Sequence, residues 1–81
     1  MFDREYIIYM DYRPYEIKAA NIEKCVNKFG KLLGWDGAFI YSACGGNFVI
    51  KQLLPKHLRE EEIPMSAYIT IYDANGNIAW R

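Results

Sequence analysis

The sequence predicts a two-layer α+β domain in which an antiparallel sheet of four to five strands carries one long helix on one face. Three observations predict this class. Most segments between turn residues are rich in aromatic and β-branched residues, which favour strands. Residues 14–33 instead carry apolar side chains at helical spacing. The 81 residues, of which 52% are hydrophobic, suit one folded domain over residues 1–81 and are too apolar for disorder.

The first half of the chain is expected to hold one strand and the long helix. Residues 5–12 are rich in aromatic and β-branched side chains and predict a strand that is apolar on both faces near its middle. Pro14 then stands where a helix would begin, and apolar residues recur at helical spacing from Tyr15 onward, which predicts a helix over residues 14–33. Gly34 follows as its C-terminal cap.

Turn residues divide the second half of the chain. Gly45-Gly46 is a short connection of the kind that joins two strands of a hairpin, and Asn75-Gly76 is the strongest hairpin dipeptide in the chain. The expected elements are, in order, strands at 38–43 and 47–54, a short helix at 56–62, and strands at 65–73 and 77–81.

The predicted order is therefore β-α-β-β-(short α)-β-β. With the short helix counted, its first six elements match the split βαβ, or ferredoxin-like, arrangement. Without that helix, the prediction is an antiparallel sheet with a single helix across one face. Both alternatives give two layers.

The charges cancel in total but not locally. Ten Lys and Arg balance ten Asp and Glu, so the net charge is zero. This net charge excludes a protein that is strongly basic overall, as many nucleic-acid binders are, and one that is strongly acidic overall, as nucleic-acid mimics are. Residues 13–33 carry five positive and two negative charges, a local net of +3. Lys24, Lys28 and Lys31 fall on one side of the predicted helix. This basic side is either a solvated helix face or a surface for a partner.

Seven of the residues are tyrosines, and the alternation of side chains along a strand predicts where most of them point. Aliphatic side chains group on one face of the sheet, which suits packing under the helix. Aromatic side chains group on the other face, which would then be open. The aromatic residues assigned to the open face are Phe39, Tyr41, Phe48, Tyr68 and Tyr72.

An open aromatic face has two functional interpretations. Tyrosines are favoured anchors at protein interfaces, and they also stack on the bases of single-stranded RNA. No segment carries the RRM motif, and the neutral net charge weakens the electrostatic attraction that dominates nucleic-acid affinity. A third interpretation stays open, in which the tyrosines are simply half-buried strand residues.

The sequence contains no clear catalytic or metal-binding constellation. Cys44 and His57, the single histidine, are the one candidate pair of nucleophile and base, and nothing in their spacing demands contact. Cys25 falls on the apolar side of the helix and is expected in the core. Two cysteines and one histidine show none of the close ligand pairs of zinc sites. We therefore expect no catalytic residues, no metal and no cofactor.

The expected function is that of a small non-enzymatic module that binds a partner protein and regulates or inhibits it, through the three helix lysines and the five aromatic residues. Ten Ile against two Val hint at an AT-rich genome, which fits a phage- or virus-type inhibitor of a host enzyme or defence system. The alternative is an RNA-binding module that uses the same residues.

No apolar run is long enough to span a membrane, so the sequence predicts a cytoplasmic protein without a membrane partner. The strand expected at residues 77–81 carries a large aromatic residue, Trp80, just before its end, and is expected to be tucked into the fold. If exposed, it would be able to pair with a second copy of the chain and form a homodimer.

Overall fold

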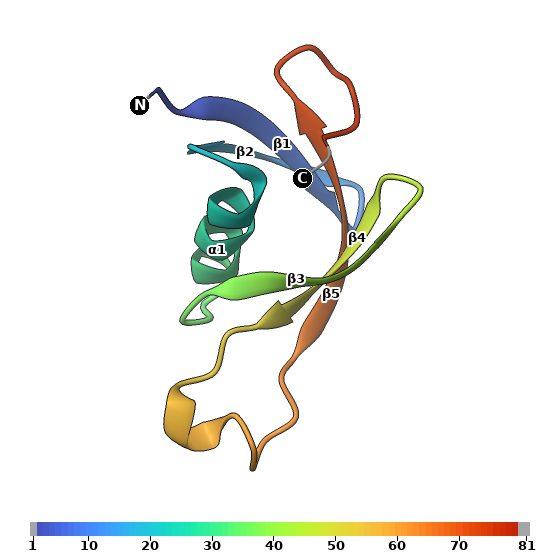
Figure 1. Ribbon diagram of the computed structural model, residues 1–81. Helices are drawn as coiled ribbons and strands as arrows, with labels where there is room; N and C mark the ends of the chain where they lie inside the picture. The colour runs from blue at the N-terminus through green and yellow to red at the C-terminus, as the bar shows by residue number, and fades with distance from the viewer. Residues whose placement is uncertain (1, 80–81) are drawn as a thin grey trace.

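A five-stranded antiparallel sheet curls around one helix (Figure 1). The structure is a computed structural model that describes residues 2–79, and it confirms the predicted two-layer α+β class. The strand order across the sheet is β2-β1-β5-β4-β3, and each strand is antiparallel to its neighbours. The elements in chain order are β1 (Arg4–Met10), β2 (Arg13–Ala19), α1 (Ile22–Leu32), β3 (Ala38–Cys44), β4 (Asn47–Gln52), the 3-10 turn η1 (Lys56–Leu58) and β5 (Ser66–Asp73).

The first part of the predicted helix is a strand, so two strands precede the helix. Asp11 and Tyr12 have φ angles of 51° and 65°, and Met10 pairs with Arg13 across them. Positive φ at both central residues is the mark of a two-residue type I′ turn. This turn folds β2 back along β1. From α1 to β5 the elements follow the predicted order.

Both ends of α1 are capped by local hydrogen bonds. The Oδ1 atom of Asn21 accepts from the backbone N–H of Lys24 at 2.9 Å, which satisfies one free N–H of the first turn. At the other end, the N–H of Gly34 donates to Lys31 and that of Trp35 donates to Gly30. This is the Schellman pattern, and the φ of +85° at Gly34 suits glycine. The predicted role of Gly34 as a cap is confirmed.

The last expected elements are shorter than predicted. The short helix at 56–62 is a three-residue 3-10 turn. In the segment predicted as a fifth strand at 77–81, Ile78 forms one isolated bridge with Tyr72, and residues 80–81 lie outside the described part of the chain. The fifth strand of the sheet is instead β2.

The strand pairing excludes the ferredoxin-like alternative. That arrangement needs a second helix that crosses over the sheet between its third and fourth strands. Here the segment between β4 and β5 holds only a three-residue 3-10 turn, and β5 pairs directly with β4 as its antiparallel neighbour. The arrangement formed is the other predicted one, an antiparallel sheet with a single long helix.

The core lies between α1 and the inner face of the sheet. Phe29, Val26 and Cys25 of the helix are fully buried there. The helix lies so close to the start of β3 that a Cβ atom built on Gly30 would be 2.7 Å from the Cβ of Ala38. The sheet contributes Tyr6, Ile8, Ile17, Phe48, Ile50, Ile69 and Ile71. No helix in the described part of the chain has the length and apolarity needed to cross a membrane.

Candidate functional site

The outer face of the sheet, turned away from α1, presents exposed aromatic side chains. Tyr68 is 79% exposed, Tyr41 61% and Phe39 43%. Tyr72 lies on the same face and is half-buried. The predicted open aromatic face is therefore present in the structure for these four residues.

The prediction for Phe48 is wrong. Phe48 is fully buried, and it pairs with Ile69 across β4 and β5 on the side that faces the helix. Val49 takes the outer position instead. The sequence of β4 is apolar at successive positions, so alternation alone does not show which side chain faces inward.

Two further tyrosines belong to the outer face and were not assigned to it from the sequence. Tyr9 of β1 packs against Tyr72 of β5, with ring centroids 5.6 Å apart and ring planes at 89°. Tyr12 stands fully exposed at the tip of the β1–β2 turn. The Asp-Tyr pair that forms this turn lacks glycine, so no hairpin was expected there.

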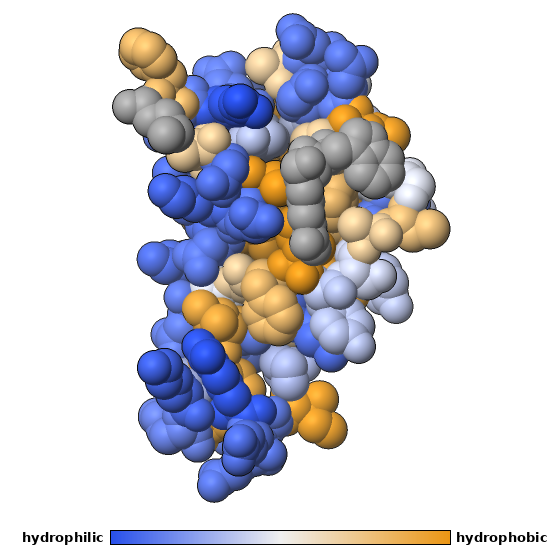
Figure 2. All heavy atoms as spheres, viewed as in Figure 1, coloured by the Kyte–Doolittle hydropathy of each residue, from blue (hydrophilic) through white to orange (hydrophobic). Residues whose placement is uncertain are grey.

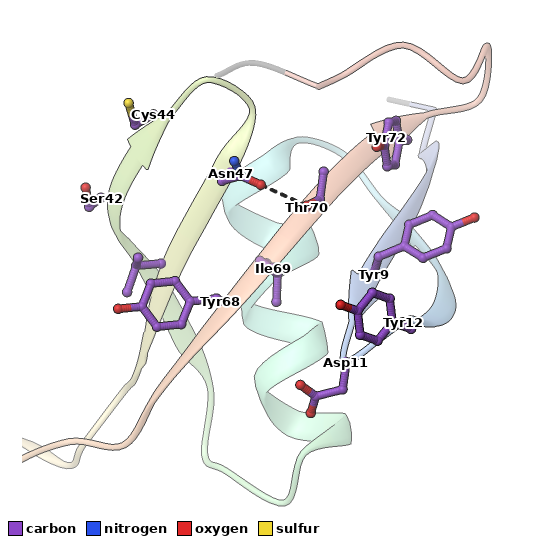
Figure 3. A pocket seen from close by; sticks show the side chains of 11 residues that line it. Tyr9, Asp11, Tyr12, Ser42, Cys44, Asn47, Tyr68, Ile69, Thr70 and Tyr72 are labelled. Atoms are coloured by element: carbon purple, nitrogen blue, oxygen red, sulfur yellow. Dashed lines mark hydrogen bonds between the residues drawn. The ribbon is translucent and has the colours of Figure 1, made fainter.

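These tyrosines border a broad open hollow of about 800 Å³. Figure 3 shows Tyr9, Tyr12 and Tyr72 on one side of the hollow and Tyr68 on the other. Between them the Oγ1 atom of Thr70 donates a hydrogen bond to Oδ1 of Asn47 at 3.2 Å. The lining residues are Tyr9, Asp11, Tyr12, Ser42, Cys44, Asn47, Val49, Tyr68, Ile69, Thr70 and Tyr72.

The two lysines of the outer face already have partners. The Nζ atom of Lys51 lies over the Tyr41 ring, 3.8 Å from its centroid, and Lys18 forms an exposed ion pair with Glu5 at 3.8 Å. The carboxylates of Asp11 and Glu16 have no ion-pair partner within the part of the chain that the structure describes. The Tyr41 ring is neutral, so Lys51 keeps its positive charge. The three carboxylates of Glu5, Asp11 and Glu16 still outnumber the two lysines, so the net charge of this face is negative.

The three helix lysines lie on the opposite layer of the molecule. Lys24 and Lys31 point away from the buried side of α1, and Figure 2 shows a largely hydrophilic surface over this helix. Lys28 is also exposed, but its Nζ atom donates to the backbone carbonyl of Lys18 and ties the helix to the end of β2. The lysines and the sheet tyrosines thus do not form one continuous surface.

The candidate nucleophile and base are far apart. Cys44 ends β3 and pairs with Asn47, the first residue of β4, whereas His57 lies in the 3-10 turn beyond the other end of β4. The six residues of β4 alone span about 17 Å at about 3.4 Å per residue. Cys44 and His57 therefore cannot share a proton.

Cys25 is a core residue, as predicted. Burial raises the pKa of its thiol from 9.0 to about 12, and the nearby charge of Lys28 opposes this rise only in part. A thiol with this pKa is neutral and unreactive at neutral pH. Among residues 2–79, no three His, Cys, Asp or Glu side chains gather in a way that would hold a metal ion.

Comparisons with known proteins leave the function to be argued from the site alone. No protein-family model, no curated protein and no solved structure matches this chain.

Proposed function

We propose that this protein is a non-enzymatic binding module that docks the aromatic outer face of its sheet on a partner protein and so regulates or inhibits that partner. The observation that carries the proposal is the set of exposed rings on a face that no other described element covers. Exposed contiguous apolar surface on a small domain marks an interaction site, and tyrosines are frequent anchors of such sites.

The rigidity of the face supports the proposal. Tyr68 and Tyr72 belong to β5, which is paired on both sides by β1 and β4. Side chains on a central strand need little ordering when a partner binds, so less of the interaction energy is lost to conformational entropy. Docking of such a face over a cleft would block it, which is the simplest route to inhibition.

The alternative, an RNA-binding module, has weaker support. Base stacking on the tyrosines needs nearby positive charge to hold the phosphates. Lys24 and Lys31 lie on the opposite layer, and the outer face carries unpaired carboxylates. One strand of RNA would have to reach around the molecule to use both surfaces. The further proposals, a phage- or virus-type source and a cytoplasmic location, rest on composition only.

A pull-down from the cells in which the protein occurs tests the proposal. The tagged wild type is compared with a Tyr41→Ala/Tyr68→Ala double variant and with a matched Lys24→Ala/Lys31→Ala double variant, with and without nuclease, and the captured proteins are identified by mass spectrometry. We expect the same partner with the wild type and the lysine variant, and its loss with the tyrosine variant.

Two outcomes contradict the proposal. Loss of the partner on nuclease treatment would favour the RNA alternative. Loss with the lysine variant and retention with the tyrosine variant would place the interface on the helix layer. Circular dichroism of each variant shows that the fold is retained.

A further inference from the structure

The hollow on the outer face combines aromatic rings with a single charged group. Four of its lining residues are tyrosines, and Asp11 is the only charged residue among them. Figure 3 shows the Asp11 carboxylate on the same side of the hollow as Tyr12. The other polar groups of the lining, on Ser42, Asn47 and Thr70, are neutral.

Tyrosine rings and a carboxylate together attract a cation. The face of a tyrosine ring is negative and holds an ammonium or guanidinium group within about 6 Å of its centroid. The same sheet face already shows this interaction within the chain, because Lys51 lies over the ring of Tyr41 at 3.8 Å. An anion such as a phosphate would be repelled by Asp11, the only charged residue of the lining.

The turn that presents these groups is conformationally unusual. Asp11 and Tyr12 both have positive φ, a region that L-residues other than Asn, Asp and Gly seldom adopt. A type I′ turn is normally built from Asn and Gly. Tyr12 therefore occupies a position that favours glycine, while its ring is completely exposed. Residues held in such conformations cluster at functional sites.

We propose that the hollow binds an arginine side chain from an exposed segment of the partner protein. This inference rests on the proposed function and specifies the chemistry that the same face recognises. The planar guanidinium stacks on tyrosine rings and donates several hydrogen bonds in a fixed geometry. Asp11 pairs with its charge, and the neutral oxygens of the lining accept its remaining N–H groups.

NMR titration of the ¹⁵N-labelled full chain tests the inference with a defined probe. The blocked peptide Ac-Gly-Arg-Gly-NH2 is compared with the same peptide carrying citrulline, which is neutral and nearly isosteric, and with one carrying glutamate. We expect saturable shifts of the amides around Tyr9, Asp11, Tyr12 and Tyr68 with the arginine peptide only. Equal shifts with the citrulline peptide, or no shifts in this region, would overturn the inference.

Two variants separate this inference from the proposed function. Asp11→Asn removes the charge but keeps a residue that readily adopts the positive φ of this turn. It should raise the dissociation constant of the arginine peptide about threefold, the effect of one exposed ion pair. Lys24→Ala on the opposite layer should leave it unchanged. If the pull-down partner is lost with Tyr68→Ala yet the arginine peptide does not bind the wild type, the docking face stands and the arginine inference fails.

Discussion

The rings of Tyr9 and Tyr72 meet edge to face across β1 and β5, with centroids 5.6 Å apart and ring planes at 89°. Tyr68 lies on the same face of β5, but its ring does not pack against another aromatic ring among the described residues. Tyr72→Leu should therefore lower the free energy of unfolding by about 1 kcal/mol more than Tyr68→Leu does, because it breaks the ring pair. Urea denaturation of the two variants measures the difference. Equal losses would show that the ring contact contributes nothing to stability.

Replacement of Tyr12 by glycine should separate stability from binding. Glycine adopts the φ of +65° without strain, so Tyr12→Gly should raise the free energy of unfolding by about 1 kcal/mol. It also removes one ring of the hollow and should weaken binding of the arginine peptide. Urea denaturation and the NMR titration provide the two readouts.

The second two-residue turn of the sheet provides a matched control. Gly45 has a φ of +58°, and a Cβ atom there would meet nothing within 4 Å. Gly45→Ala should lower stability by about 1 kcal/mol through backbone strain alone. If Tyr12→Gly were neutral while Gly45→Ala was destabilising, contacts of Tyr12 with the fold would have to offset its strain.

The close approach of α1 to β3 depends on Gly30. Alanine has the higher helix propensity, but a Cβ at this position would lie 2.7 Å from backbone and side-chain atoms of Ala38. Gly30→Ala should therefore lower the free energy of unfolding by about 1–3 kcal/mol, the usual effect of overpacking. Lys31→Ala, the adjacent exposed position, should change it by less than about 0.5 kcal/mol. A stabilised Gly30→Ala variant in urea denaturation would contradict the packing described for this contact.

The two cysteines should differ in reactivity. Cys44 is exposed and Cys25 is fully buried, so Ellman's reagent at pH 8 should label one thiol of the native protein and both thiols in denaturant. Rapid labelling of both native thiols would show that the core opens readily.

The raised pKa of Cys25 also predicts a loss of stability at alkaline pH. Burial in the folded state holds the thiol pKa at about 12, against its ordinary value of 9.0 in the unfolded chain. The thiol therefore loses its proton more easily in the unfolded state. The contribution of the protonated, buried thiol to the free energy of unfolding is complete below pH 9 and is lost progressively as the pH rises towards 12. Cys25→Ala should show a smaller fall in unfolding free energy between pH 9 and 11 than the wild type shows.

The sequence predicted the sheet, the helix C-terminus and most of the open aromatic face, but it misplaced the segment around Tyr15. Tyr15 and Ala19 are four residues apart, and this spacing suits one face of a helix as well as one face of a strand. The deciding feature is the backbone conformation of Asp11 and Tyr12. Neither residue identity nor periodicity reveals positive φ in a turn without glycine.

The error at Phe48 has a different cause. Phe48, Val49 and Ile50 are all apolar, so a shift of one residue exchanges the two faces of the strand without changing its hydrophobic character. The register is set by the pairing of Phe48 with Ile69 of β5, a contact between residues distant in sequence. The hollow depends on the same long-range pairing, because it gathers β1, β3, β4 and β5 on one face.

The central position of β5 has a consequence for how the chain is made. β5 joins the β1–β2 hairpin to the β3–β4 hairpin, yet its residues, Ser66–Asp73, are synthesised after both. Until they leave the ribosome, the two hairpins have no common neighbour, and the apolar inner surface of each remains open to other chains. These apolar surfaces should therefore stay exposed until β5 has left the ribosome, and translation that stops before residue 66 should release an aggregation-prone fragment.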